Sequence, residues 1–195
     1  MTTISNSPEQ QFQPVSRMVY LQDGFTDQEC DRIIDLGLTL PKQAATMDGG
    51  HEIQQHRRNH VAWIQANNPD NMWLNHKLRD LVRYINQEYY RYSISGLEDY
   101  QFTIYDQVSD FYHDHVDLLD HRGYHRKLSL SVQLSDPTSY TGCDLEVING
   151  FGFSQADRRR GSITAFPSFL LHRVTPIQQG CRYSLVIWAV GSYFR

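Results

Sequence analysis

The sequence predicts a mainly β protein (α+β), built as a double-sheet jelly roll with two helices packed against one sheet. From about residue 96 onward, short β-type segments follow one another with turn residues between them, which is typical of this architecture. The first half holds two stretches with helical periodicity. The chain has 195 residues, 40% of them hydrophobic, with 12 tyrosines and 9 phenylalanines, which is enough for one β-rich core. We expect a flexible leader over residues 1–14 and a single domain over residues 15–195.

The first expected helix begins at a capping box. Thr26-Asp27-Gln28-Glu29 has the Thr-x-x-Glu form, and the helix should run from there to about Leu38. Its apolar residues repeat at helical spacing, at Cys30, Ile33, Ile34 and Leu38.

The second expected helix begins near Asn68, with Pro69 in its first turn. It should be the longest helix in the chain and pack against a sheet. That face consists of Trp73, Leu74, Leu78, Leu81, Val82 and Ile85.

The expected strands alternate in polarity. Between residues 128 and 135, Leu and Val alternate with Ser and Gln, which predicts a strand with one buried face. The other expected strands lie at 17–21, 59–64, 99–106, 111–117, 143–149, 161–166, 170–175 and 181–191.

Composition limits the classes of protein to which this chain could belong. The net charge of −4 gives no indication of a nucleic-acid partner, and three cysteines without paired spacing do not form a disulfide framework. The first 14 residues lack the basic and apolar regions of a signal peptide, and no apolar run approaches the length of a membrane span. A cytoplasmic, reducing setting is therefore expected.

The candidate metal ligands are centred on the stretch from Phe111 to Asp117. Strand alternation should point His113, His115 and Asp117 to the same side. An imidazole and a carboxylate side by side supply two of the three ligands of a facial triad for Fe(II). His172, on a late strand, is the best candidate for the third. One alternative stays open, in which His113 and His115 bind the metal as His-x-His and Asp117 only supports them.

A candidate anion site follows the third ligand. Arg182 comes ten residues after His172, and its guanidinium can bind a carboxylate through two hydrogen bonds. Tyr105 lies on the strand before the His-x-Asp pair, where its hydroxyl can donate to the same carboxylate. Ser184 shares a strand face with Arg182.

These residues resemble the prolyl 4-hydroxylase-like branch of the Fe(II)/2-oxoglutarate dioxygenases. The resemblance extends from about Arg57 to the C-terminus and includes 57–64, 126–135 and the run from Arg182 to Trp188, which is similar to the last barrel strand of oxygen-sensing prolyl hydroxylases. The segment 140–145 departs from it at Cys143, where the branch commonly has Gly-Gly-x-Leu.

The resemblance implies a distorted double-stranded β-helix and a set of cofactors. His115, Asp117 and His172 would hold Fe(II), and Arg182, helped by Tyr105 or Ser184, would bind the C5 carboxylate of 2-oxoglutarate. With O2, and ascorbate as an optional supporting reductant, the implied reaction hydroxylates an unactivated C–H bond and releases succinate and CO2.

The resemblance leaves the substrate open. A prolyl residue in a peptide or protein is the best expectation from the branch, with a free amino acid or a small metabolite as alternatives. A monomer or homodimer is expected.

Two other classes of protein remain as alternatives. One is a non-catalytic, cupin-like binding module, and the other is a cupin-type isomerase or dioxygenase that needs no cosubstrate. Arg182 argues against the first, because a silent barrel has no need of a cation ten residues past a ligand histidine. Sites of the second type usually hold more histidines.

Substrate recognition is expected at two polar segments, residues 41–56 and 118–126. Both contain glycines, and we expect them to act as lids that are mobile without substrate and become ordered when it binds; the alternative is that they are ordinary surface loops. His121 and His125 fall in the second segment. They either contact substrate or are ordinary loop residues. The candidate substrate contacts are Arg122, Tyr124, Arg126 and Trp188.

Overall fold

The structure is a computed structural model that describes residues 18–45, 56–118, 120–121 and 124–193. The expected leader over residues 1–14 lies outside the described residues. Most of the proposed lid over residues 41–56, and residues 119, 122 and 123 of the second lid, also lie outside them. In the described part of the chain, no helix is both long and apolar enough to cross a membrane.

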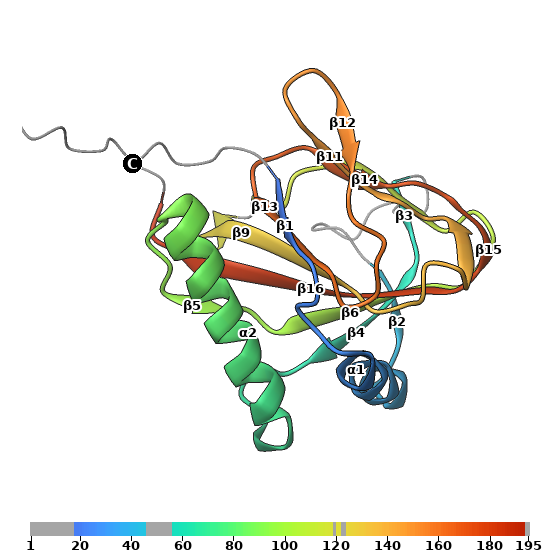
Figure 1. Cartoon of the computed structure of the whole chain (residues 1–195), viewed down its shortest axis with the longest axis horizontal. Helices are drawn as coiled ribbons and strands as arrows, with labels where there is room; N and C mark the ends of the chain where they lie inside the picture. Colours follow the sequence, from blue (N-terminus) through green and yellow to red (C-terminus); the bar gives the residue numbers. More distant parts are fainter. Residues whose placement is uncertain (1–17, 46–55, 119, 122–123, 194–195) are drawn as a thin grey trace, which may run out of the picture.

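Two antiparallel sheets and a short ribbon make up the β part (Figure 1), which confirms the expected double-stranded β-helix. Among the described strands, nine form the large sheet, in the order β1 (Val19–Leu21), β13 (Ile163–Pro167), β9 (Tyr124–Gln133), β16 (Arg182–Gly191), β6 (Tyr100–Tyr105), β4 (His60–Ile64) and β2 (Gln43–Ala44), with β5 (Gly96–Leu97) on β16 and β8 (Asp120–His121) on β9. The second sheet runs β12 (Phe153–Gln155), β11 (Leu145–Ile148), β14 (His172–Val174), β7 (Phe111–His115) and β3 (Arg57–Arg58). The ribbon pairs β10 (Tyr140–Gly142) with β15 (Ile177–Gly180).

Helix α1 (Asp27–Thr39) begins at the expected capping box. The Thr26 side chain accepts from the Glu29 backbone N–H at 3.2 Å, and the Glu29 carboxylate accepts from the Thr26 N–H at 2.8 Å. The expected apolar face is wrong at its C-terminal end, where Leu38 is 39% exposed and Gly37 is buried instead. The missing side chain lets the helix backbone approach the ring of Phe102 closely, because a Cβ at Gly37 would lie 2.4 Å from ring carbons.

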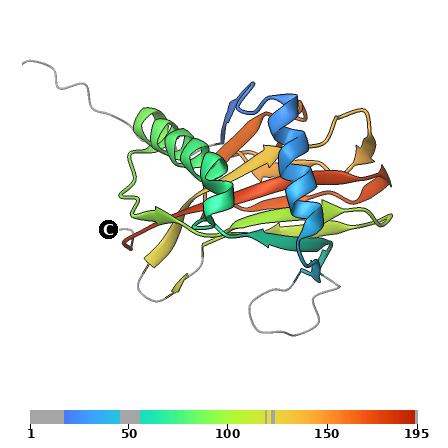
Figure 2. The same ribbon diagram turned by 90° about the horizontal axis from the view of Figure 1, so that it is seen from below.

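Helix α2 (Met72–Ile85) confirms the second expected helix. It follows a 3-10 turn (Pro69–Asn71) capped by the Asn68 side chain and continues into a π-helical turn (Asn86–Tyr90). Both helices lie on the same face of the large sheet (Figures 1 and 2). The core between helices and sheet includes Cys30, Ile33, Leu74, Leu78, Val82, Phe102, Leu130, Val132 and Ile187.

The large sheet is apolar toward the helices and polar on its other face. On β6, Tyr100, Phe102 and Ile104 belong to the helix-side core, while Gln101, Thr103 and Tyr105 line an internal cavity. The same alternation occurs on β9, but the expectation that only one face of this strand is buried is wrong. Ser129 and Gln133 are 1% and 4% exposed, because that face is covered by the second sheet.

Candidate metal centre

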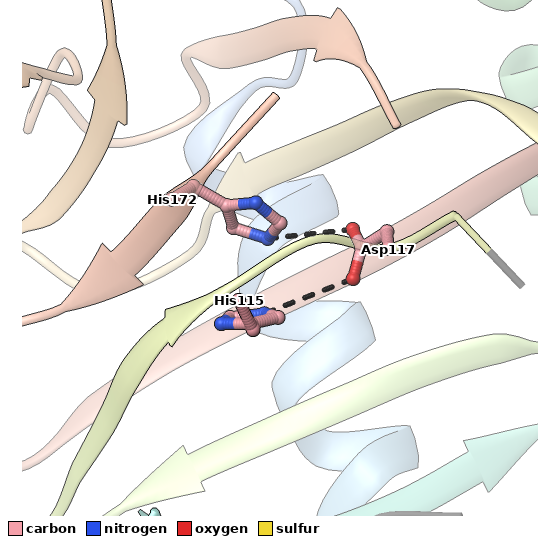
Figure 3. A group of neighbouring side chains, drawn as sticks. All are labelled: His115, Asp117 and His172. Carbon is pink, nitrogen blue, oxygen red and sulfur yellow. Dashed lines mark ion pairs between the residues drawn. The ribbon is translucent and has the colours of Figure 1, made fainter. Parts of the chain in front are cut away.

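Three side chains from the second sheet converge where β7 and β14 meet. His115 is the last residue of β7 and pairs across the sheet with His172, the first residue of β14, while Asp117 follows β7 by two residues. The Asp117 carboxylate oxygens lie 3.7 Å from His115 Nε2 and 3.4 Å from His172 Nε2 (Figure 3). One potential ligand atom from each residue lies within 4.8 Å of the others.

The histidine rings are held in the orientation that a metal requires. His115 Nδ1 is 2.7 Å from the carbonyl of His113, and His172 Nδ1 is 2.9 Å from the carbonyl of Leu170. A carbonyl can only accept, so each neutral ring carries its proton on Nδ1 and presents the lone pair of Nε2. Two such nitrogens and one carboxylate are the donor set of a facial triad, so these residues fit Fe(II).

The electrostatics of the cluster favour a charged carboxylate and a neutral His115. Burial would raise the pKa of Asp117, but the neighbouring His172 and His115 outweigh burial and hold this pKa far below its usual range. Burial, together with the nearby His172, lowers the pKa of His115 to about 3. Burial also acts to lower the pKa of His172, but Asp117 outweighs it and raises that pKa.

His113 lies outside the cluster, so the expectation that it points with His115 and Asp117 is wrong. The register between β14 and β7 shifts between His172↔His115 and Val174↔Tyr112, which is a bulge on β7. The bulge breaks the alternation and stacks the Tyr112 ring on the His115 ring, with centroids 3.4 Å apart. The His113 side chain is exposed and packs on Phe111.

A cavity of about 450 Å³ adjoins the three residues, between the two sheets. Tyr105, Arg182 and Ser184 all line it, as do Arg126 and Trp188. The sequence reasoning missed several polar or aromatic lining residues, namely Arg57, Trp63, Gln101, Thr103, Tyr112 and Ser131.

Arg182 is a buried cation without an acidic partner. It is 4% exposed, and its Nε donates to Gln133 Oε1 at 2.9 Å. The polar groups nearest its charge are Cys143, Tyr140 and Tyr105, and no carboxylate of the described residues pairs with it. A buried charge without a counterion is costly, so an anionic ligand at this end of the cavity would complete the site.

Tyr105 and Ser184 lie on neighbouring strands beside Arg182. Arg182 Cζ is 5.8 Å from the centroid of the Tyr105 ring, and burial raises the pKa of Tyr105, which keeps the phenol protonated and able to donate. Ser184 is 2% exposed and pairs in register with Thr103 and Gln133.

The candidate substrate residues differ in their surroundings. Arg126 lies 3.7 Å from the ring centroid of Trp188 and forms an ion pair with Glu98 at 2.7 Å, so its charge is already neutralised. The Trp188 indole nitrogen is buried, and Trp188 is one of the groups that hold the pKa of Asp117 below its usual range. Tyr124 is not among the residues lining the cavity, and Arg122 lies outside the described residues. The His125 ring packs on Tyr193.

Cys143 occupies a backbone position suited to glycine. Its φ is 56°, in the left-handed region, and the preceding Gly142 has a φ of 69°. Burial raises the pKa of the Cys143 thiol to about 11, so the thiol stays protonated. This conformation explains why a glycine is common here in the family that the sequence resembles.

Comparison with known proteins points to one superfamily. Residues 100–190 match the sequence model of the 2OG-Fe(II) oxygenase superfamily. A PKHD-type hydroxylase from Teredinibacter turnerae is 41% identical over 61 residues, which is 31% of this chain and 27% of that protein. The PKHD-type hydroxylase YbiX from Escherichia coli O157:H7 is also 41% identical over 61 residues, again 27% of its length. The matched segment thus spans about a quarter of these relatives.

Solved structures share the fold at low sequence identity. A prolyl hydroxylase from Trichoplax adhaerens, in complex with a peptide fragment of the hypoxia inducible factor oxygen degradation domain, has a TM-score of 0.74 and 16% identity, and the match covers 89% of this chain and 83% of that chain. A Pseudomonas putida prolyl-4-hydroxylase has a TM-score of 0.66 and 17% identity, covering 88% and 91%. The viral collagen prolyl hydroxylase of Paramecium Bursaria Chlorella virus-1, in its 2OG complex, has a TM-score of 0.68 and 16% sequence identity. This match covers 89% of this chain and 96% of that chain.

Proposed function

We propose that the protein is a member of the 2OG-Fe(II) oxygenase superfamily, whose sequence model residues 100–190 match, and that it is an Fe(II)- and 2-oxoglutarate-dependent dioxygenase that hydroxylates an unactivated C–H bond. We also propose that residues 15–195 form a single domain. One observation carries the functional proposal. The three residues that can form a facial triad line the same cavity as Arg182, a buried arginine that pairs with no carboxylate of the described residues.

His115, Asp117 and His172 would hold the iron. Ferrous iron, 2-oxoglutarate and O2 would supply the oxidising chemistry when bound: one oxygen atom of O2 would enter succinate as the cosubstrate loses CO2, and the other would enter the substrate as its new hydroxyl group. The protein binds, orients and excludes water. The Nδ1–H bonds of the two histidines fix their rings, and Ser129 fixes the Asp117 carboxylate with a hydrogen bond of 2.7 Å.

Arg182 would bind the C5 carboxylate of 2-oxoglutarate. Its guanidinium is fixed by Gln133 and needs an anion, which makes a dicarboxylic cosubstrate a better match than a neutral ligand. This need also argues against the alternative of a silent, cupin-like binding module. Tyr105 and Ser184 line the same cavity and supply further hydroxyl donors.

A prolyl residue in a peptide or protein is the substrate we propose. Support comes from the structural similarity to prolyl hydroxylases, one of them solved with a peptide. Aromatic side chains of Trp63, Trp188 and Tyr112 line the cavity and offer apolar faces for a pyrrolidine ring. A free amino acid or small metabolite is the alternative, since a cavity of about 450 Å³ also suits a small ligand.

The test has two stages. The purified protein is first incubated with Fe(II), 2-oxoglutarate and O2, and succinate is measured with and without each component. Succinate formation that requires Fe(II), 2-oxoglutarate and O2 together supports the proposed reaction class. If the wild-type protein forms no succinate under any condition, the proposed reaction class is refuted. Candidate prolyl peptides and free amino acids are then screened by mass for the gain of one oxygen atom, which separates the two substrate classes.

A further inference from the structure

We propose that Arg57 binds a carboxylate of the substrate that is hydroxylated, so that this substrate is an acid and not a neutral prolyl segment. The carboxylate is either the terminal group of the target residue itself or the side chain of an acidic residue next to it. The inference rests on the proposed function, because it names the chemistry of the substrate at the same site. Arg57 lies on β3 and is not among the substrate contacts expected from the sequence.

Arg57 is a second buried cation of the cavity. It lines the cavity and is 7% exposed. Its Nε donates to Asn59 Oδ1 at 2.8 Å, and its Cζ lies 4.4 Å from the centroid of the Tyr112 ring. Both partners are neutral, and no carboxylate of the described residues forms an ion pair with Arg57. A buried charge without a counterion is costly, so a bound anion would complete this part of the cavity.

Asn59 holds the guanidinium without neutralising it. A guanidinium can only donate, so the amide oxygen of Asn59 faces Arg57 and the amide nitrogen faces away. That nitrogen is buried and has no hydrogen-bond partner within the described part of the chain. An aspartate would have nearly the same shape and would give Arg57 an internal counterion. With asparagine at this position, the positive charge remains available to a ligand.

The position of Arg57 suits a contact with substrate. Arg57 pairs in register with Tyr112 across β3 and β7, and the Tyr112 ring stacks on the ring of His115 with centroids 3.4 Å apart. Only one side chain therefore separates the guanidinium from a candidate iron ligand. Arg182 lies on β16 of the large sheet, whereas Arg57 belongs to the second sheet, which also carries the metal ligands. A ligand held by Arg57 would lie beside the metal centre.

The charges of the cavity indicate an anion in addition to 2-oxoglutarate. Among the described residues that line the cavity, Asp117 is the only acid, and the third arginine, Arg126, is already paired with Glu98 at 2.7 Å. With Fe(II) and doubly charged 2-oxoglutarate bound, the metal, Arg57 and Arg182 would leave an excess of one positive charge. The two carboxylates of the cosubstrate would be used at the metal and at Arg182. A carboxylate from the substrate would then neutralise Arg57.

The test uses two pairs of probes, and the members of each pair differ only in one carboxylate. N-acetylproline and N-acetylprolinamide test a terminal carboxylate, while acetyl-Pro-Glu amide and acetyl-Pro-Gln amide test a neighbouring acidic side chain. Binding to the protein loaded with Fe(II) and 2-oxoglutarate is measured without oxygen by tryptophan fluorescence, since Trp63 and Trp188 line the cavity. The wild type should bind at least one acid about tenfold or more tightly than its amide, and the pair that shows this preference identifies the source of the carboxylate.

Two variants assign the preference to Arg57. Arg57→Gln removes the charge, and Asn59→Asp supplies an internal counterion. Both should bind acid and amide equally, while their affinity for 2-oxoglutarate stays that of the wild type. Arg58→Gln is the matched control, because it removes the neighbouring arginine of β3, which is exposed and lies 3.4 Å from Asp110. This control should keep the preference of the wild type.

Three results would overturn the role of Arg57. The first is equal binding of acid and amide by the wild type in both pairs, a comparison that depends on no variant. The second is a preference for the acid that persists in Arg57→Gln and Asn59→Asp. The third is weaker binding of 2-oxoglutarate to Arg57→Gln, which would assign Arg57 to the cosubstrate. A wild-type protein that does not bind 2-oxoglutarate at all would refute the proposed function, which is a different outcome.

Discussion

Ser129 donates a hydrogen bond of 2.7 Å to Asp117 Oδ2, and so connects the large sheet to the candidate metal centre in the second sheet. Ser129 Oγ is also 2.9 Å from Ser168 Oγ, and the Asp117 N–H donates to the Ser168 carbonyl at 2.9 Å. Asp117 is therefore held through its carboxylate by Ser129 and through its backbone N–H by Ser168. Groups that orient a ligand in this way affect metal affinity without touching the metal.

The first prediction is that Ser129→Ala weakens Fe(II) binding by about 10- to 100-fold, the usual effect of removing such a supporting bond. Calorimetric titration of the metal-free protein measures the affinity. Ser131→Ala is the matched control, because Ser131 lies two residues further on the same strand face and, within the described part of the chain, forms no hydrogen bond with Asp117. Equal affinities of the two variants would show that Ser129 does not orient the carboxylate.

The second prediction assigns the ligands. Alanine at His115, Asp117 or His172 should abolish Fe(II) binding, because each change removes one of three donors that converge. His113→Ala should keep the metal, since this side chain is exposed and packs on Phe111. Iron content after anaerobic loading and desalting measures the outcome. Loss of iron in His113→Ala, with retention in Asp117→Ala, would reverse the assignment.

Strand alternation explains how much of this site the sequence could predict. It correctly brings Arg182 and Ser184 to one face, and the His-x-Asp pattern identifies two members of the cluster. Gln101, Thr103 and Tyr105 also alternate with apolar residues and line the cavity, but alternation alone does not distinguish a polar face that lines a cavity from one that faces solvent.

Other features depend on contacts that no local pattern contains. The bulge on β7 that turns His113 away arises from the register between β7 and β14. The bond from Arg182 to Gln133 joins residues 49 positions apart, and it becomes visible only when β9 and β16 pair. Gly37 replaces Leu38 on the buried face of α1 because the helix packs closely on one aromatic ring.

The third prediction concerns the buried cation. Arg182→Ala should weaken 2-oxoglutarate binding strongly, since breaking a buried charged pair on one side costs about 3–5 kcal/mol, and Fe(II) binding should remain. Apparent affinity from succinate formation over a range of cosubstrate concentrations is the measurement. Arg173→Ala, which removes an arginine that is 38% exposed and paired with Glu146, serves as the control. An unchanged cosubstrate requirement in Arg182→Ala would remove this residue from the site.

The last prediction concerns the packing of α1 on the large sheet. A Cβ at Gly37 would lie 2.4 Å from carbons of the Phe102 ring, and this ring is fully buried and stacked on Tyr183 with centroids 5.5 Å apart. Phe102 cannot move aside without displacing its neighbours, so Gly37→Ala should lower the free energy of unfolding by about 1–3 kcal/mol even though alanine favours helix. Gly96→Ala is the control, because nothing lies within 4 Å of a Cβ built there. Urea unfolding of the two variants measures the difference, and a Gly37→Ala protein as stable as the wild type would mean that the helix can shift away from the sheet at no cost.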